Sequence, residues 1–313
     1  MAGTRRVIAY VAVAGVAVLV GAVLVLLFGP RGNGRDTPGA AGAGINQAEQ
    51  AAAGASSAPP GTGSAAGQAG PLPAAVAAYL RGRHGTVAAA VYDVRTGRTW
   101  RLGDGKAQPE ASIVKLDILE TLLARPRGAA LAPADEALAR SMIEDSDNGA
   151  ATSLWEEDGG AAGLTYYGDR AGLADTTPSQ CVTCAGFAFP GWGLSTTVPE
   201  DQLTLLKQLV VPGASPLLSK SARSYALSLM EHVTDDQRWG ISGGVPAGVT
   251  VALKDGWLPL DEAATNWQVN SVGWVSGGGR DYLIAVLSTG NPTEQYGIDT
   301  ISALSALVWN AMR

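Results

Sequence analysis

A change in composition near residue 72 limits which part of this chain can fold. Residues 30–71 consist mostly of Gly, Ala, Ser, Pro and Gln and show no apolar periodicity. Such a segment cannot bury enough apolar surface to offset the entropy lost on folding. We therefore predict a disordered linker over residues 30–72. Residues 73–313 are apolar enough to form a sizeable core, and we expect them to form the folded domain.

The segment before the linker predicts a membrane anchor. Val7–Phe28 is an unbroken run of apolar residues and glycine, long enough to span a bilayer as a helix. Arg5 and Arg6 precede it and favour a cytoplasmic N-terminus. We therefore expect residues 1–29 to form a single-pass transmembrane anchor or signal-anchor at the cell membrane, with the folded domain extracytoplasmic. The alternative is a cleaved signal peptide and a secreted domain, although no Ala-x-Ala site follows Phe28.

A serine and a lysine open a strongly apolar helical segment. The residues after Lys115 are apolar at helical spacing, which predicts a helix that begins near Ser112. Residues three apart on a helix share a face, so the hydroxyl of Ser112 and the amine of Lys115 can meet. A lysine can activate a serine when burial or a neighbouring cation lowers the pKa of its amine. Alone, the pattern is more simply explained by a surface Ser and Lys on an amphipathic helix.

Two further motifs follow in an informative order. Ser146-Asp147-Asn148 lies in a segment of turn-forming residues, and Lys254-Asp255-Gly256 lies near the end of the chain. The order S-x-x-K, S-D-N and K-T-G is the signature of class A β-lactamases and penicillin-binding proteins. The chain from about Leu72 to Arg313 therefore resembles the class A β-lactamase-related serine hydrolases. The third motif departs from the family pattern, because Asp255 stands where Thr or Ser is usual.

The resemblance implies a role for each motif residue. Ser112 would be the nucleophile, Lys115 the general base, and Ser146 the relay of a proton to the leaving amine. The residues expected to bind the substrate are Asn148, Lys254, Asp255 and Gly256. The backbone amides of Ser112 and Trp257 would form the oxyanion hole. An aspartate at position 255 would repel a substrate carboxylate or neutralise Lys254, so we expect weak affinity for penicillin-like anions.

The resemblance also predicts an omega loop, within a stretch from Leu164 to Trp192 that we expect to be rich in loops. In the family, a glutamate of this loop activates the water that releases the acyl-enzyme. No glutamate lies between Gly159 and Pro199, and Asp169 and Asp175 are the only carboxylates there. The sequence therefore predicts weak or no turnover of β-lactams.

Cys181 and Cys184 are the only cysteines of the chain. In an exported domain they favour a local disulfide over two free thiols. A metal site would need more ligands, and His84 and His232 are remote in sequence. Since no metal or nucleotide motif is present either, the sequence predicts neither a metal ion nor another cofactor.

The apolar periodicity predicts helices and strands whose order is compatible with the family fold. We expect strands over residues 86–93, 99–102, 250–255, 267–275 and 281–288. We expect helices over residues 73–81, about 112–125, 133–144, 150–155, 202–211, 217–232 and 298–312. The resemblance implies an α/β (α+β) fold, in which an antiparallel sheet flanked by helices adjoins an all-helical subdomain and the site lies between the two.

Two functions from different classes fit these observations. The first is a membrane-tethered serine hydrolase that forms an acyl-enzyme with a β-lactam, a peptidoglycan-like peptide or another ester or amide. The second is a catalytically degenerate binding or scaffold protein on the same fold. Asp255 and the missing glutamate favour the second function, whereas the intact Ser112, Lys115, Ser146 and Asn148 favour the first. The net charge of −6, with no basic stripe, argues against nucleic acid as a partner.

Overall fold

A computed structural model describes residues 73–125, 131–184, 191–214 and 216–312. The expected anchor over residues 1–29 and the expected linker over residues 30–72 lie outside the described residues. Within the described ranges, no helix is both long enough and apolar enough to cross a membrane.

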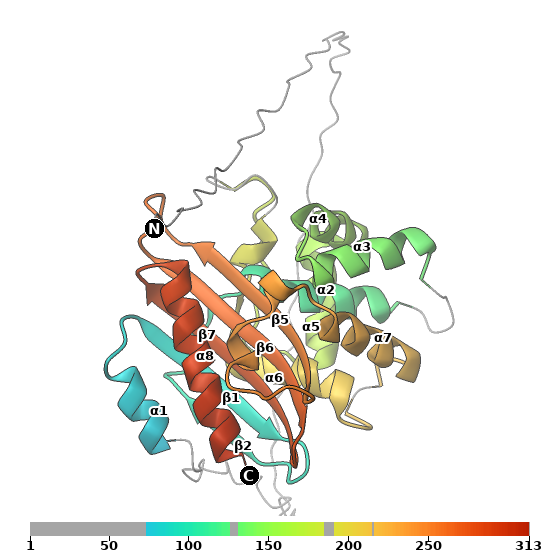
Figure 1. The fold of residues 1–313 in the computed structure, drawn as a ribbon. Coiled ribbons are helices and arrows are strands. Elements are labelled where there is room, and N and C mark those ends of the chain that lie inside the picture. Colours follow the sequence, from blue (N-terminus) through green and yellow to red (C-terminus); the bar gives the residue numbers. More distant parts are fainter. Residues whose placement is uncertain (1–72, 126–130, 185–190, 215, 313) are drawn as a thin grey trace, which may run out of the picture. The chain divides into compact units, whose positions relative to one another are not determined.

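A five-stranded antiparallel sheet organises the described residues (Figure 1). The strand order is β2-β1-β7-β6-β5. The bounds are Thr86–Asp93 for β1, Thr99–Leu102 for β2, Thr250–Pro259 for β5, Trp267–Gly277 for β6 and Arg280–Asn291 for β7. The run from Tyr282 to Ser288 is fully buried, which suits the central strand β7. Because β5 is an edge strand, one row of its backbone groups faces away from the sheet.

Helices cover both faces of the sheet. The long helix α8 (Glu294–Ala311) packs on β6 and β7, and the short helix α1 (Pro73–Leu80) packs beside it. Figure 1 shows α8 in front of the sheet and the helical part to the right of the sheet. Helix α6 (Pro199–Val210) packs against β1 and β7 and also contacts the helical part. The apolar faces of these helices and of the sheet therefore form one continuous core.

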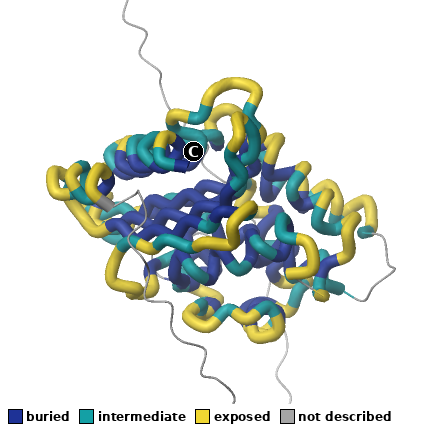
Figure 2. The backbone as a smooth tube through the Cα atoms, turned by 90° about the horizontal axis from the view of Figure 1, so that it is seen from below, coloured by how far each residue is buried: buried dark blue, intermediate teal, exposed yellow. Residues whose placement is uncertain are grey.

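The helical part surrounds one central helix. Helix α2 (Val114–Leu123) packs against five other helices. These are α3 (Pro133–Glu144), α4 (Asn148–Glu157), α5 (Gly160–Ala171), α6 and α7 (Lys220–Glu231). The first seven residues of α2 are at most 4% exposed, as expected for a helix enclosed by others. Figure 2 shows the buried segments concentrated in the sheet and in the helices packed on it.

Most predicted elements are present, but the limits of several were wrong. Helices α6 and α8 begin earlier than predicted, and α7 begins later. The stretch predicted as loop from Leu164 forms part of α5, because Leu164, Tyr167 and Gly168 recur at helical spacing and are buried. Helix α4 begins earlier than predicted because the side chain of Asp147 caps it. The last three strands are longer than predicted, since their pairing with neighbouring strands continues beyond the predicted ends.

Candidate active site

Ser112 lies on a short, unusual turn at the start of the central helix. The 3₁₀ turn η1 (Ala111–Ile113) leads directly into α2. Ala111 has a φ of 51°, in the left-handed region that residues other than glycine seldom adopt. Such backbone conformations persist where the surrounding structure holds them, often at functional sites. Ser112 is half-buried between fully buried neighbours, so a rigid turn presents its hydroxyl at a partly open surface.

The amine of Lys115 is buried and fully engaged with the turn between α3 and α4. Its Nζ lies 2.6 Å from the backbone oxygen of Ser146 and 2.8 Å from Asn148 Oδ1, both of which accept hydrogen bonds from it, and 3.0 Å from Ser146 Oγ. Burial, and then the positive charge of Lys254, lower the pKa of Lys115 to about 6. At neutral pH, Lys115 is therefore largely uncharged and can accept a proton.

Ser146 links the two lysines of the site. Its Oγ lies 3.0 Å from Lys115 Nζ and 3.0 Å from Lys254 Nζ, so it can accept a hydrogen bond from the charged Lys254 and donate one to the neutral Lys115. Its backbone has a φ of 56°, again in the left-handed region. Asp147 holds the turn in place, since its carboxylate accepts a hydrogen bond from the amide of Ala150 at 2.6 Å. The hydroxyl of Ser146 is thus placed to exchange protons with either amine.

The edge strand β5 lies directly against the start of the central helix. Lys254 is fully buried, and burial lowers the pKa of its amine to about 8. A Cβ atom at Gly256 would lie 2.6 Å from the amide nitrogen of Ser112 and 2.7 Å from that of Ile113. Only a glycine permits this approach. Trp257 directly follows Gly256 and is half-buried, so its backbone amide is the next one along β5 after the contact with Ser112.

Asp255 faces the opposite side of the sheet from Lys254. Neighbouring residues of a strand point to opposite faces. The Asp255 carboxyl is fully buried, accepts a hydrogen bond from the Trp239 amide at 3.1 Å and lies across the ladder from Ser271. Burial raises the pKa of this carboxyl to about 8. The structure thus does not bring the Asp255 carboxyl to the side of Ser112, in contrast to the expected contact with a substrate.

The loop after α5 places an aromatic ring over the lysine. Its 3₁₀ turn η2 (Gly191–Leu194) packs against η1. The ring centroid of Trp192 lies 5.2 Å from Lys115 Nζ. The two carboxylates named from the sequence, Asp169 and Asp175, are both exposed. Cys181 and Cys184 are joined by a disulfide in the same loop. Sequence reasoning missed Trp192, because nothing in its neighbourhood distinguishes it from a core residue.

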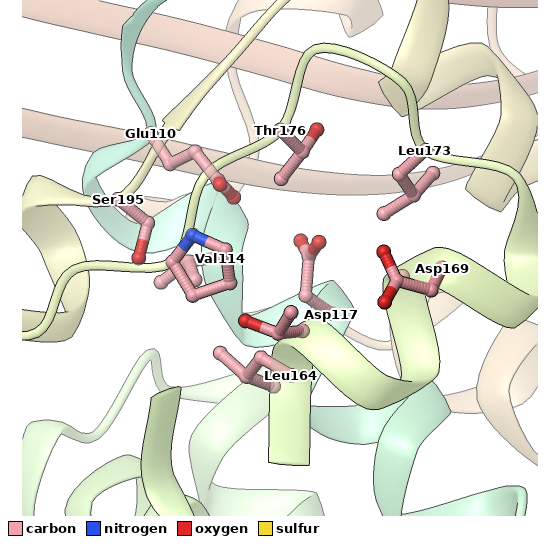
Figure 3. Close-up of a pocket in the computed structure, with 11 residues that line it drawn as sticks. Glu110, Val114, Asp117, Leu164, Asp169, Leu173, Thr176 and Ser195 are labelled. Atoms are coloured by element: carbon pink, nitrogen blue, oxygen red, sulfur yellow. The ribbon is translucent and has the colours of Figure 1, made fainter. Parts of the chain in front are cut away.

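Two buried acids close to the site were also missed. Figure 3 shows the side chains of Glu110 and Asp117 at a cavity between α2, α5 and the loop that follows α5. The cavity volume of about 20 Å³ suits about one water molecule. Burial, and then the charge of Asp117, raise the pKa of Glu110, and burial raises the pKa of Asp117 to about 7. The two carboxyls can share one proton. No sequence pattern marks this pair.

The fold and the convergent motif residues define the architecture of a β-lactamase-related serine hydrolase. The chain belongs to the Beta-lactamase enzyme family, whose family model matches residues 136–312. It is also 30% identical over 210 residues to the proteins named "Putative lipoprotein LppW" from Mycobacterium bovis and Mycobacterium tuberculosis. That alignment covers 65% of this chain and 63% of each relative, so the chain spans less than two thirds of their length.

Solved structures confirm the fold. TLA-1 extended spectrum β-lactamase superimposes with a TM-score of 0.65 at 17% identity, covering 77% of this chain and 97% of the other. The class A β-lactamase from Mycobacterium abscessus superimposes with a TM-score of 0.63 at 23% identity, covering 77% of this chain and 98% of the other. The predicted antiparallel sheet flanked by helices is therefore confirmed as the class A β-lactamase fold.

Proposed function

We propose that this protein is a serine hydrolase that forms an acyl-enzyme through Ser112 with a β-lactam or with an amide like those of cell-wall peptides. The observation that carries the proposal is the contact of Ser146 Oγ with both Lys115 Nζ and Lys254 Nζ. Three motifs distant in sequence thereby meet beside one half-buried serine. A chain that only binds a partner has no chemical need for this arrangement.

Acylation would begin with a proton transfer within one helical turn. Neutral Lys115 takes the proton of the Ser112 hydroxyl as its Oγ attacks the substrate carbonyl carbon. The negative charge that develops on the carbonyl oxygen is stabilised by the backbone amides of Ser112 and Trp257. The C–N bond then breaks, and Ser146 passes a proton to the departing nitrogen. Lys254, charged below pH about 8, favours the proton's movement from Lys115 to Ser146.

The acyl-enzyme would be released slowly. The family's glutamate has no counterpart between Gly159 and Pro199. Asp169 and Asp175 are exposed, and among the described residues no hydrogen bond or ion pair joins either side chain to the motif residues. We therefore propose weak or no turnover of β-lactams, with the substrate acylating the protein more readily than water deacylates it.

The catalytic domain would act outside the cytoplasm, tethered to the membrane. The apolar run Val7–Phe28 supports this, as do the relatives named lipoprotein and the Cys181–Cys184 disulfide, which is typical of oxidising compartments. Fractionation of cells that express the full chain should place it with the membranes, and deletion of residues 1–29 should abolish that association. Recovery of the full chain in the soluble cytoplasmic fraction would contradict this assignment.

Covalent labelling tests the acyl-enzyme. Incubation with a fluorescent penicillin or a fluorophosphonate should label the wild-type protein, and intact mass should show one adduct. Ser112→Ala should remove the label, whereas Ser221→Ala, an exposed serine on α7, should not. Absence of labelling by both probes would contradict the proposal.

The alternative function is a binding or scaffold protein on the same fold. Asp255 specifically favours it, because the site lacks the hydroxyl that the family uses next to the lysine, and the buried Asp255 carboxyl faces the other side of the sheet. Under this alternative, neither probe acylates Ser112, and Ser112→Ala leaves every binding property of the domain unchanged.

A further inference from the structure

The indole of Trp192 is held firmly against the amine of the candidate base. Trp192 is 1% exposed. Its Nε1 donates to Thr152 Oγ1 at 3.2 Å, and Thr152 Oγ1 donates to the backbone oxygen of Asn148 at 2.9 Å. Asn148 in turn accepts a hydrogen bond from Lys115 through its side chain. The ring is therefore fixed to helix α4, the same helix that carries Asn148, a hydrogen-bond partner of Lys115.

The disulfide turn supports this ring from behind. The amide of Gly191 donates to the backbone oxygen of Cys181 at 2.8 Å. A Cβ atom at Gly191 would overlap Cys184 Sγ and would lie 3.2 Å from Cys181 Cβ. The Cys181–Cys184 turn thus packs directly on the residue that precedes Trp192, and it limits how far the indole can move.

There is no room for a water molecule between the amine and the ring. A water bonded to Lys115 Nζ would need about 3 Å to the nitrogen and a further 3 to 3.5 Å to the ring atoms, or roughly 6 Å in all. The ring centroid is only 5.2 Å from the nitrogen. The contacts of Nζ with two oxygens of Ser146 and one of Asn148 leave few other directions in which a water could bond to it.

We propose that Trp192, fixed by the Cys181–Cys184 turn, is a positioning residue that excludes water from Lys115 and so prolongs the lifetime of the Ser112 acyl-enzyme. This inference rests on the proposed function. In hydrolysis, a water oxygen attacks the ester carbonyl and gives one proton to a base, the C–Oγ bond breaks, and Ser112 Oγ regains a proton. Lys115, three residues after Ser112, is the candidate base for that water, and Trp192 leaves no room for a water on the side of the amine that its ring covers.

The test compares acylation and deacylation in variants of position 192. Trp192→Ala should raise the rate at which the penicillin acyl adduct disappears by at least tenfold, with a smaller change in the rate at which the adduct forms. Intact mass after removal of free penicillin follows both rates. Trp192→Phe should restore a long lifetime, because a phenyl ring still excludes water. Trp309→Phe, at a buried tryptophan of α8, is the matched control and should not alter the lifetime.

A second pair of variants tests the support from the loop. Cys181→Ser combined with Cys184→Ser should shorten the adduct lifetime in the same direction as Trp192→Ala. If Trp192→Ala fails to fold by thermal melting, Trp192→His takes its place, because its smaller ring leaves space for water. An unchanged lifetime in a folded variant overturns the inference while leaving the proposed function intact. Absence of any adduct on the wild-type protein overturns the proposed function, and this inference with it.

Discussion

The chemistry of the site depends on which protonation state Lys115 adopts. An ammonium cannot accept the proton of Ser112, so the base must be neutral at working pH. Burial is the main cause of the lowered pKa of Lys115, and the charge of Lys254 adds to it. The pKa of Lys254 is about 8 and that of Lys115 about 6. Between pH 6 and 8, Lys254 therefore stays charged while Lys115 is neutral.

The rate of acylation should therefore rise with pH through about 6 and level off below about 8. Removing the charge of Lys254 makes it easier to protonate Lys115, so Lys254→Gln should move the lower midpoint upward, in addition to slowing acylation. The labelling rate of a fluorophosphonate across pH measures this midpoint. Lys220→Gln, which removes an exposed lysine at the start of α7, is the control. An unmoved midpoint in Lys254→Gln would show that the two amines are not coupled.

The close approach at Gly256 leads to a second prediction. Gly256→Ala adds a carbon at 2.6 Å from the Ser112 amide nitrogen, and backbone atoms cannot move aside as a flexible side chain can. The edge of β5 must shift, which should destabilise the domain by about 1–3 kcal/mol. It should also lower the labelling rate about a hundredfold or more, because the oxyanion hole loses its geometry.

A glycine without such contacts provides the control for this experiment. In Gly82→Ala, the new carbon lies 3.7 Å from the nearest heavy atom, the oxygen of Tyr79, which is an ordinary contact. Its labelling rate should equal that of the wild-type protein. A normal labelling rate in folded Gly256→Ala would mean that β5 does not contribute to the site.

At the scale of elements, the sequence predicts those parts of the site that depend on local pattern. The apolar spacing after Lys115 predicted the central helix, and the turn residues around Ser146 predicted a break between two helices. The left-handed backbone of Ala111 and the burial of Asp117 had no such signal, since both result from packing by remote elements. The side of the sheet that Asp255 faces depends on strand register, which the motif alone does not give.

The cap of α4 should matter for both stability and acylation. Asp147→Ala removes the acceptor for the Ala150 amide and should lower the free energy of unfolding by about 1 kcal/mol. Because α4 starts at Asn148, fraying of its first turn should also displace the Asn148 side chain, a hydrogen-bond partner of Lys115, and slow labelling.

Another helix cap separates these two effects. Ser219 caps α7 by accepting a hydrogen bond from the Ala222 amide at 3.1 Å, and its side chain bonds only within the start of α7 among the described residues. Ser219→Ala should therefore cost about as much stability as Asp147→Ala, with an unchanged labelling rate. Chemical denaturation and labelling kinetics on both variants measure the two quantities. Equal labelling rates in the two variants would show that the α4 cap has only a structural role.

At the scale of the whole folded part, the site is a junction of elements that are far apart in sequence. The start of α2, the turn before α4, the edge strand β5 and the turn η2 meet around one serine and one lysine. Buried acids lie behind this junction, where Glu110 and Asp117 share a small cavity (Figure 3). Ionising both carboxyls in that space would place two like charges together with little water. The stability of the fold should therefore depend on pH.

The sign of this dependence follows from the raised pKa values. Burial raises the pKa of Asp117 from its ordinary value of 3.8 to about 7, so between about pH 4 and 7 the folded state binds more protons than the unfolded chain. The contribution of this carboxyl to the free energy of unfolding thus falls as pH rises through that range.

In Asp117→Asn this contribution is absent, so the unfolding free energy of the variant minus that of the wild type should increase between pH 5 and 8. An increase of at least about 1.4 kcal/mol corresponds to one unit of raised pKa. The lysines of the site titrate in both proteins, so their opposite effect largely cancels in this difference. Urea unfolding at several pH values measures it, with Asp299→Asn, at an exposed position of α8, as the control. A difference that stays flat across this range would show that the buried pair carries no proton beyond that of ordinary carboxyls.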